Sequence, residues 1–162
     1  MVGGLFHLLN HAVMKGCLFL VAGGVRWRTG ATTVKAYAGM GRRFPLSMAA
    51  FLVAALSMIG LPPTAGFFSK WYLLVGAFEA QAWVVIAAVI VSSALSAIYF
   101  FRVLEKAFFH ASDEINPASE GTELPGVMVG PVVILAAVVL LLGILNEPIV
   151  THFVMHALPP NV

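Results

Sequence analysis

The feature that most constrains this chain is an interruption in the middle of a long apolar segment, residues 46–78. The interruption contains two glycines, two prolines and a lysine: Gly60, Pro62, Pro63, Gly66 and Lys70. Pro63 has no backbone N–H to donate, and its ring disfavours the α-helical conformation at Pro62. The segment is therefore predicted to form a helix that stops near residue 60 and starts again near residue 66.

The composition places this interrupted helix in a membrane. Hydrophobic residues make up 60% of the 162 residues and charged residues 10%, against roughly 45–50% and 25% in soluble domains. The mean hydropathy is +0.97. Residues 84–101 and 127–146 contain no charge, and each stretch can cross a hydrocarbon core about 30 Å thick. We predict an all-α membrane protein with about four transmembrane helices, one of them discontinuous.

The predicted helices divide the chain into a membrane domain and a short tail. They cover about residues 2–22, 46–78 with a break at 60–66, 82–104 and 127–145. The Gly23-Gly24 pair is expected to end the first helix, and the polar residues 108–125 are expected to be an exposed loop. The membrane domain thus comprises residues 1–145, and residues 146–162, with His152 and His156, are expected to lie along the membrane interface.

Charge predicts the orientation in the membrane. Five basic residues and no acidic one occupy the connection between the first two helices: Arg26, Arg28, Lys35, Arg42 and Arg43. By the positive-inside rule, this connection at 25–45 is cytoplasmic and both termini are external. No basic segment precedes the first apolar stretch, so we expect no cleavable signal and favour a prokaryotic inner membrane.

Ionisable residues recur along one face of the first helix. His7, His11 and Lys15 follow each other at intervals of four, and Asn10 lies beside them. Histidine can relay protons, and several ionisable groups at membrane depth indicate a polar path. A lone histidine is more often packed than functional, and a metal site is the rival interpretation. No HExxH motif or third ligand accompanies the pair, so no metal is predicted.

Lys70 is the most informative single residue. A charged side chain far from the ends of a membrane segment implies a polar path, although a lysine that reaches an interface is the alternative. The break exposes carbonyls near residues 57–60 and N–H groups near 66–69, which must face protein or a water-filled cavity. Lys70 between these groups is a candidate to load and release a proton.

These residues resemble the antiporter-like proton-conducting subunits of respiratory complex I, of multisubunit Na⁺/H⁺ antiporters and of membrane-bound hydrogenases. The resemblance is carried by residues 7–20, by Gly39-Met-Gly41-Arg42-Arg43 with Pro45, and by residues 60–70. Residues 131–135 and 143–148 are most similar to the antiporter D subunit.

The resemblance implies a fold of fourteen transmembrane helices, of which this chain would supply the last four. By position, His7, His11 and Lys15 match the central hydrophilic axis on the eleventh helix, and Lys70 matches the lysine of the second broken helix, in the proton exit path. The first half-channel and everything before the eleventh helix would be absent. Partner membrane subunits, including those missing helices, are therefore expected.

Proton translocation, with Na⁺ as a possible coupled ion, is the leading functional hypothesis. The chain contains no P-loop, dinucleotide fingerprint or nucleophile constellation, so any redox reaction would belong to other subunits, and neither a cofactor nor a nucleic-acid partner is expected. Cys17 is the single cysteine. The alternatives are a structural membrane subunit or a truncated segment without transport of its own, and a haem or quinone protein, which predicts a cofactor absorbance.

Overall fold

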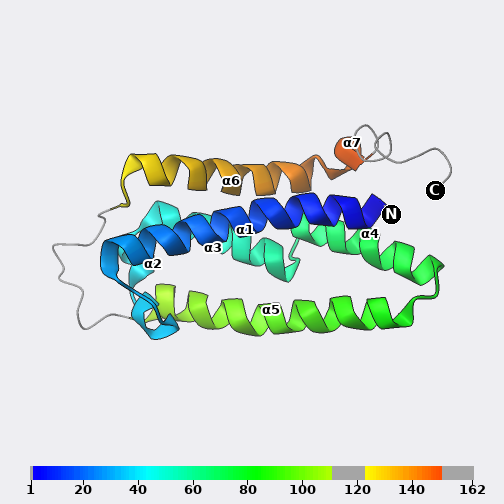
Figure 1. Cartoon of the computed structure of the whole chain (residues 1–162), viewed down its shortest axis with the longest axis horizontal. Helices are drawn as coiled ribbons and strands as arrows, with labels where there is room; N and C mark the ends of the chain where they lie inside the picture. Colours follow the sequence, from blue (N-terminus) through cyan, green and yellow to red (C-terminus); the bar gives the residue numbers. More distant parts are fainter. Residues whose placement is uncertain (1, 111–122, 151–162) are drawn as a thin grey trace.

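The computed structural model describes residues 2–110 and 123–150, and this part of the chain is helical without any strand (Figure 1). Its elements in chain order are α1 (Val2–Thr29), the short 3₁₀ helix η1 (Val34–Tyr37), α2 (Met40–Arg43), α3 (Pro45–Ile59), α4 (Ala65–Glu79), α5 (Trp83–Phe109), α6 (Gly126–Ile144) and α7 (Asn146–Ile149). Within these ranges α1, α5 and α6 are long and apolar enough to cross a membrane. The predicted fold class, an all-α membrane protein, is confirmed.

The predicted interruption is present between α3 and α4. Each of these helices has 15 residues, about 22 Å, which is shorter than the hydrocarbon core of about 30 Å. Helix α3 ends at Gly60, whose φ of +97° is left-handed, and α4 begins after Thr64. The two helices follow each other along the molecule behind α1 (Figure 1). Together they make one discontinuous membrane segment.

The first helix is longer than predicted. The Gly23-Gly24 pair lies inside α1, which continues to Thr29. Gly24 packs against the Leu124 side chain, because an added Cβ would lie 2.6 Å from Leu124 Cδ1. The left-handed residue that ends the helix is Gly30, with a φ of +72°. The predicted end near residue 22 is wrong, because Gly24 allows a close contact with Leu124 and does not end the helix.

The basic connection and the end of α5 are also more helical than predicted. Arg26 and Arg28 form the last turn of α1, and Arg42 and Arg43 belong to α2. Helix α5 continues beyond the predicted residue 104 to Phe109. The physical reason is the contact between α5 and α2: a Cβ added at Gly41 would lie 2.7 Å from the Phe108 ring. This packing extends α5 by a further turn.

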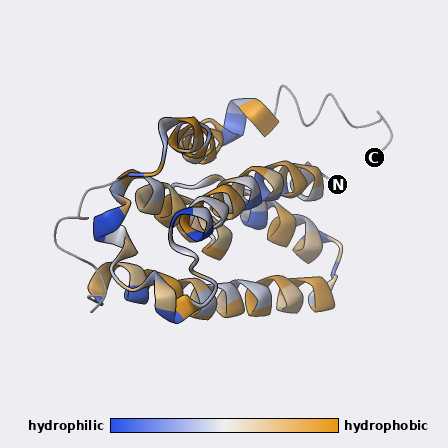
Figure 2. Ribbon diagram, turned by 60° about the vertical axis from the view of Figure 1, so that its left-hand side comes forward, coloured by the Kyte–Doolittle hydropathy of each residue, from blue (hydrophilic) through white to orange (hydrophobic). Residues whose placement is uncertain are grey.

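The helices pack around the discontinuous segment. Helix α1 contacts α3, α4 and α6, whereas α5 contacts α3 and α4. The buried core lies mainly between α1, α3 and α6 and includes Cys17, Val21, Phe44, Met48 and Val132. Hydrophobic residues cover most of the long helices (Figure 2). The apolar surfaces of these helices are compatible with lipid. Polar side chains meet instead at the break between α3 and α4.

Glu123 fixes the start of α3 and shows that the predicted exposed loop is wrong at its end. One carboxylate oxygen accepts from the backbone N–H of Leu46 at 2.7 Å and of Ser47 at 3.3 Å, and the other accepts from the Ser47 hydroxyl at 2.7 Å. The next residue, Leu124, is buried. A carboxylate from a distant segment therefore satisfies the free N–H groups of this helix terminus.

Replacing Glu123 with alanine is expected to destabilise the chain by about 1–2 kcal/mol, the usual effect of losing a helix cap. The reason is that two N–H groups of the first turn of α3 lose their acceptor. The measurement is the temperature at which half of the chain precipitates when detergent-solubilised membranes are heated. Glu105→Ala, at an exposed position on α5, is the control; equal stability of the two variants would contradict this role.

The C-terminal tail is described only up to residue 150. Helix α7 follows α6 closely, and Asn146 accepts a hydrogen bond from the Tyr72 hydroxyl at 2.9 Å and donates to the Gly143 carbonyl at 2.9 Å. His152 and His156 lie outside the described residues. The division at residue 145 into membrane domain and interfacial tail stays a prediction.

Candidate functional site at the broken helix

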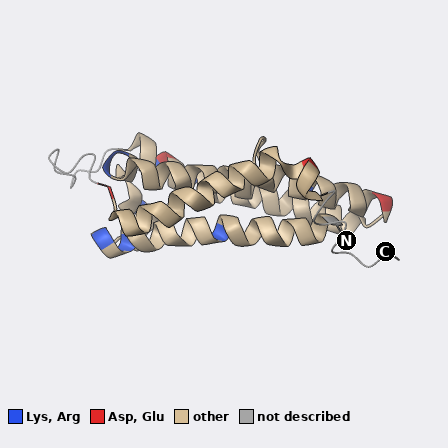
Figure 3. Ribbon diagram, turned by 90° about the horizontal axis from the view of Figure 1, so that it is seen from above, with Lys and Arg blue, Asp and Glu red and all other residues tan. Residues whose placement is uncertain are grey.

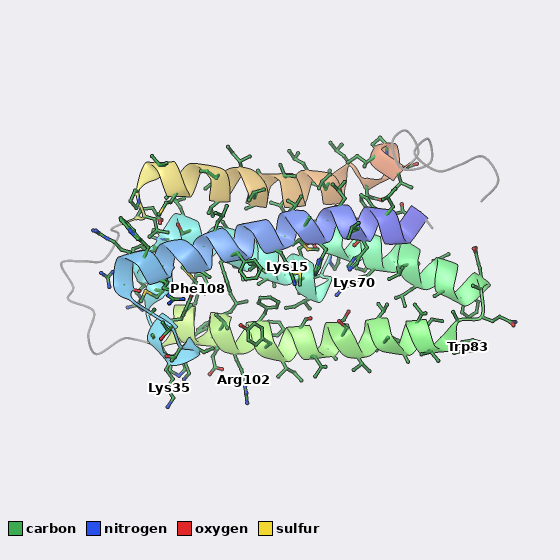
Figure 4. The ribbon with its side chains drawn as sticks, in the orientation of Figure 1. Lys15, Lys35, Lys70, Trp83, Arg102 and Phe108 are labelled. Carbon is green, nitrogen blue, oxygen red and sulfur yellow. The ribbon has the colours of Figure 1, made fainter. Side chains whose placement is uncertain are left out.

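Lys70 satisfies the end of the helix that precedes its own. Its Nζ donates to the carbonyls of Met58 at 2.8 Å and Ile59 at 3.1 Å, both at the C-terminus of α3, and to Ser93 Oγ on α5 at 2.8 Å. The C-terminus of a helix carries partial negative charge, which favours a cation. The carbonyls expected to be exposed by the break are thus occupied by Lys70, which lies in the central part of the bundle (Figure 4).

On the other side of the break, the N–H group of Gly66 also has a partner from α3. Gly66 N donates to Ser57 Oγ at 3.0 Å. A Cβ added at Gly66 would collide with the Ser57 carbonyl, and one added at Gly143 of α6 would collide with the Pro63 carbonyl. The broken ends therefore touch each other and α6 at backbone distance. Glycine at both positions makes this approach possible.

His7 reaches the first turns of α4. Its Nδ1 lies 3.0 Å from Ser69 Oγ, and Ser69 also donates to the Gly66 carbonyl at 3.1 Å. A serine hydroxyl has one proton, so when Ser69 donates to Gly66, Nδ1 of His7 is the donor and its Nε2 is left as an acceptor. The arrangement fixes one ring nitrogen of His7 and leaves the other able to take up a proton.

The other members of the predicted stripe continue away from the break along α1. The rings of His7 and His11 are 5.7 Å apart between centroids. His11 lies within electrostatic reach of both Lys15 and Lys70, and His7 lies within reach of Lys70. Lys15 is exposed in this structure. No hydrogen bond directly links two of these four residues, so proton movement between them would require intervening water or side-chain rotation.

Asn10 belongs to the site more closely than its sequence position suggested. Its side chain is fully buried, and Nδ2 donates to the Ala65 carbonyl at 3.2 Å. Its Oδ1 is buried without a hydrogen-bond partner in the described part of the chain. The signal in the sequence was a polar residue three positions after His7 within an apolar helix. Asn10 ties α1 to the first turn of α4.

Two open cavities meet at Lys70. The His7 cavity, of about 320 Å³, lies between α1, α4 and α5 and is lined by His7, Lys70 and Ser92 among other residues. The Trp71 cavity, of about 250 Å³, is lined by Gly60, Lys70, Trp71 and Ser93 among others. Lys70 lines both cavities. The Lys70 side chain thus borders, together with Val89, two spaces that are large enough for water.

The site contains four ionisable side chains, those of His7, His11, Lys15 and Lys70. Within residues 2–110 and 123–150 no three His, Cys, Asp or Glu side chains are grouped as a metal site would need. Cys17 is buried between helices, with Sγ 3.7 Å from the Ala50 carbonyl and 3.6 Å from that of Val132. The fold and the site define a helical multi-pass membrane protein whose polar centre is a lysine at a broken helix.

Residues 1–96 match the protein family described as NADH:quinone oxidoreductase/Mrp antiporter, TM, and the chain belongs to this family. It is 47% identical to NADH-quinone oxidoreductase subunit N of Desulforudis audaxviator, over 97% of this chain and 33% of that protein. It is 29% identical to the Na(+)/H(+) antiporter D subunit of Alkalihalophilus pseudofirmus, over 91% of this chain and 29% of that protein. The predicted family resemblance is confirmed.

Solved structures show the same fold. A chain of respiratory complex I from Thermus thermophilus with bound NADH superposes with a TM-score of 0.77 and 28% identity, over 96% of this chain and 33% of that one. A chain of the Mrp complex from Dietzia sp. has a TM-score of 0.80 at 22% identity, over 93% and 36%. The chain therefore spans about a third of the length of the relatives that it matches.

Proposed function

We propose that this chain takes part in moving protons across a membrane, alone or in exchange for Na⁺, as part of an antiporter-like subunit of a multisubunit complex. The observation that carries this proposal is the position of Lys70, whose ammonium group lies at the helix break and whose side chain lines a cavity together with His7. His7, His11, Lys15 and Lys70 would carry the protons. The relatives named as an oxidoreductase subunit and as an antiporter subunit support the same class of function.

The proposed orientation of the chain in the membrane follows from the distribution of its basic residues. Lys and Arg gather mainly at the end of the bundle opposite the N-terminus (Figure 3), which includes the last turn of α1 and α2. We place this end in the cytoplasm by the positive-inside rule, with both termini on the external side and the tail along the interface. The remaining helices of the longer relatives, or other membrane subunits, would enclose the exposed faces of α1 and α5.

A structural role is the second candidate, because Lys70 already has a purely structural use. Its three hydrogen bonds satisfy the end of α3 and tie it to α5. A membrane subunit that only stabilises a complex would need this lysine as much as a transporter would. The two functions differ in their need for His7 and His11 of α1, neither of which forms a hydrogen bond to the carbonyls of Met58 and Ile59.

Replacing both His7 and His11 with glutamine is expected to reduce transport roughly tenfold, since glutamine keeps hydrogen bonding but cannot relay a proton, and water can bridge part of the path. Transport is measured as the pH gradient formed by inverted membrane vesicles that contain the protein with its native partners, after addition of electron donor or Na⁺.

His110→Gln is the matched control, because His110 is exposed at the end of α5, bonded to Lys106. This variant is expected to transport normally. Full transport by the double histidine variant, at normal abundance in the membrane, would favour the structural role.

A further inference from the structure

Helix α5 presents two adjacent hydroxyl groups to the two cavities that meet at Lys70. Ser92 lines the His7 cavity and Ser93 lines the Trp71 cavity. Consecutive residues of an α-helix point about 100° apart, so two neighbouring side chains can line different cavities. Lys70 lies across the boundary between these spaces.

The ammonium group occupies one of the two sides in this structure. Ser93 Oγ and the carbonyls of Met58 and Ile59 accept its hydrogen bonds, and these three acceptors match the three donors of a lysine. To exchange a proton with His7, the nitrogen must leave these acceptors and turn toward the His7 cavity. A charged group that gives up three hydrogen bonds needs replacements on the other side.

Ser92 is suited to provide such a replacement. Its carbonyl accepts from Ser96 Oγ at 2.8 Å, but its own hydroxyl makes no hydrogen bond within the described residues. It lines the same cavity as His7 and Lys70. Ser96, by contrast, bonds to its own helix and lines neither cavity.

We propose that Ser93 and Ser92 are positioning residues for Lys70, and that their adjacent hydroxyls define two resting positions of the ammonium group, one toward the end of α3 and one toward His7. The inference rests on the proposed function, because it gives Lys70 the two positions that a proton carrier between separate cavities needs. Ser93 holds the lysine away from its proton donor, and Ser92 holds it close to that donor.

The test compares serine variants in the vesicle transport assay. Ser93→Ala and Ser92→Ala are each expected to lower transport about tenfold, the effect of losing one hydrogen bond to a charged group. Ser93→Thr keeps the hydroxyl and is expected to restore most of the rate. Ser96→Ala is the matched control on the same helix and is expected to transport normally. Ser93→Ala or Ser92→Ala with a rate equal to that of Ser96→Ala, or a Ser93→Thr variant as slow as Ser93→Ala, would overturn the proposal.

A second measurement separates this inference from the proposed function. Ser93→Ala is expected to lower the precipitation temperature of the chain in solubilised membranes by about 2–4 °C, but to have no further effect when Lys70 is already methionine. Normal transport by Lys70→Met would refute the carrier role of Lys70 and with it the need for two lysine positions, whereas a stability effect of Ser93→Ala that depends on Lys70 would still show that Ser93 positions the lysine. Equal effects of Ser93→Ala with and without Lys70 would refute its positioning role, whatever the transport result.

Discussion

Replacing Lys70 with methionine is expected to abolish transport, leaving only the passive leak of the vesicles. Methionine has a similar length but carries no proton, so the two cavities that meet at residue 70 lose the group that connects them. The measurement is the initial rate of pH-gradient formation, normalised to the amount of the chain in the membrane. Among the described titratable residues, no other lines both cavities, so we expect no substitute carrier.

The same substitution also affects stability, which the experiment must separate from transport. The carbonyls of Met58 and Ile59 lose their partner, and a buried carbonyl without a partner costs about 1–3 kcal/mol. Lys70→Arg restores a cation but not a proton carrier, because arginine does not deprotonate in proteins. We expect the arginine variant to accumulate better than the methionine variant and still not to transport.

Lys35→Met is the control for lost positive charge, since Lys35 is exposed on η1, away from the break. It is expected to retain normal transport. Transport by Lys70→Met at the rate of Lys35→Met would contradict a carrier role for Lys70. Its role would then be structural, through its hydrogen bonds to the end of α3.

The substitution Gly66→Ala is expected to destabilise the chain strongly. An added Cβ would collide with the Ser57 carbonyl, which is backbone and cannot rotate away. Separating α3 from α4 would also stretch the bond from Gly66 N to Ser57 Oγ, which is 3.0 Å long. Overpacking of this kind costs about 1–3 kcal/mol and sometimes more. We expect low abundance in the membrane and a large fall in precipitation temperature.

The matched control is Gly76→Ala on the same helix. A Cβ at Gly76 would have no heavy atom within 4 Å, and alanine favours a helix over glycine by about 1 kcal/mol. This variant is therefore expected to be as stable as the original chain or slightly more stable. If Gly66→Ala were equally stable, the close approach of the two broken helix ends would be wrong.

Both predictions concern the junction between the end of α3 and the start of α4. Lys70 and Gly66 lie in the first two turns of α4, and both act on the end of α3. Gly66 allows the helix ends to come together, and Lys70 neutralises the partial charge of the end that it meets. A lysine bound in this way is held firmly in place while it remains charged. Loss of its proton would weaken the same three hydrogen bonds, which links proton release to movement of the side chain.

The sequence by itself determined the class of the protein and the place of its interruption. A chain with 60% hydrophobic residues cannot cover so much apolar surface in water, and adjacent prolines cannot continue a helix. Both effects act within a few residues along the chain. They are independent of what packs nearby, so the break between α3 and α4 and the starts of α5 and α6 lie within one residue or so of where the sequence predicts them.

The tertiary structure decided which groups satisfy the break and where α1 ends. The bonds of Lys70 to Ser93, of His7 to Ser69 and of Glu123 to the start of α3 join residues 23, 62 and more than 70 positions apart. Local propensity contains no information about such pairs. Gly24 likewise allows α1 to continue because Leu124, far along the chain, packs on it. In this protein, backbone chemistry fixes where the helix must break, and contacts between distant helices fix what the broken ends bind.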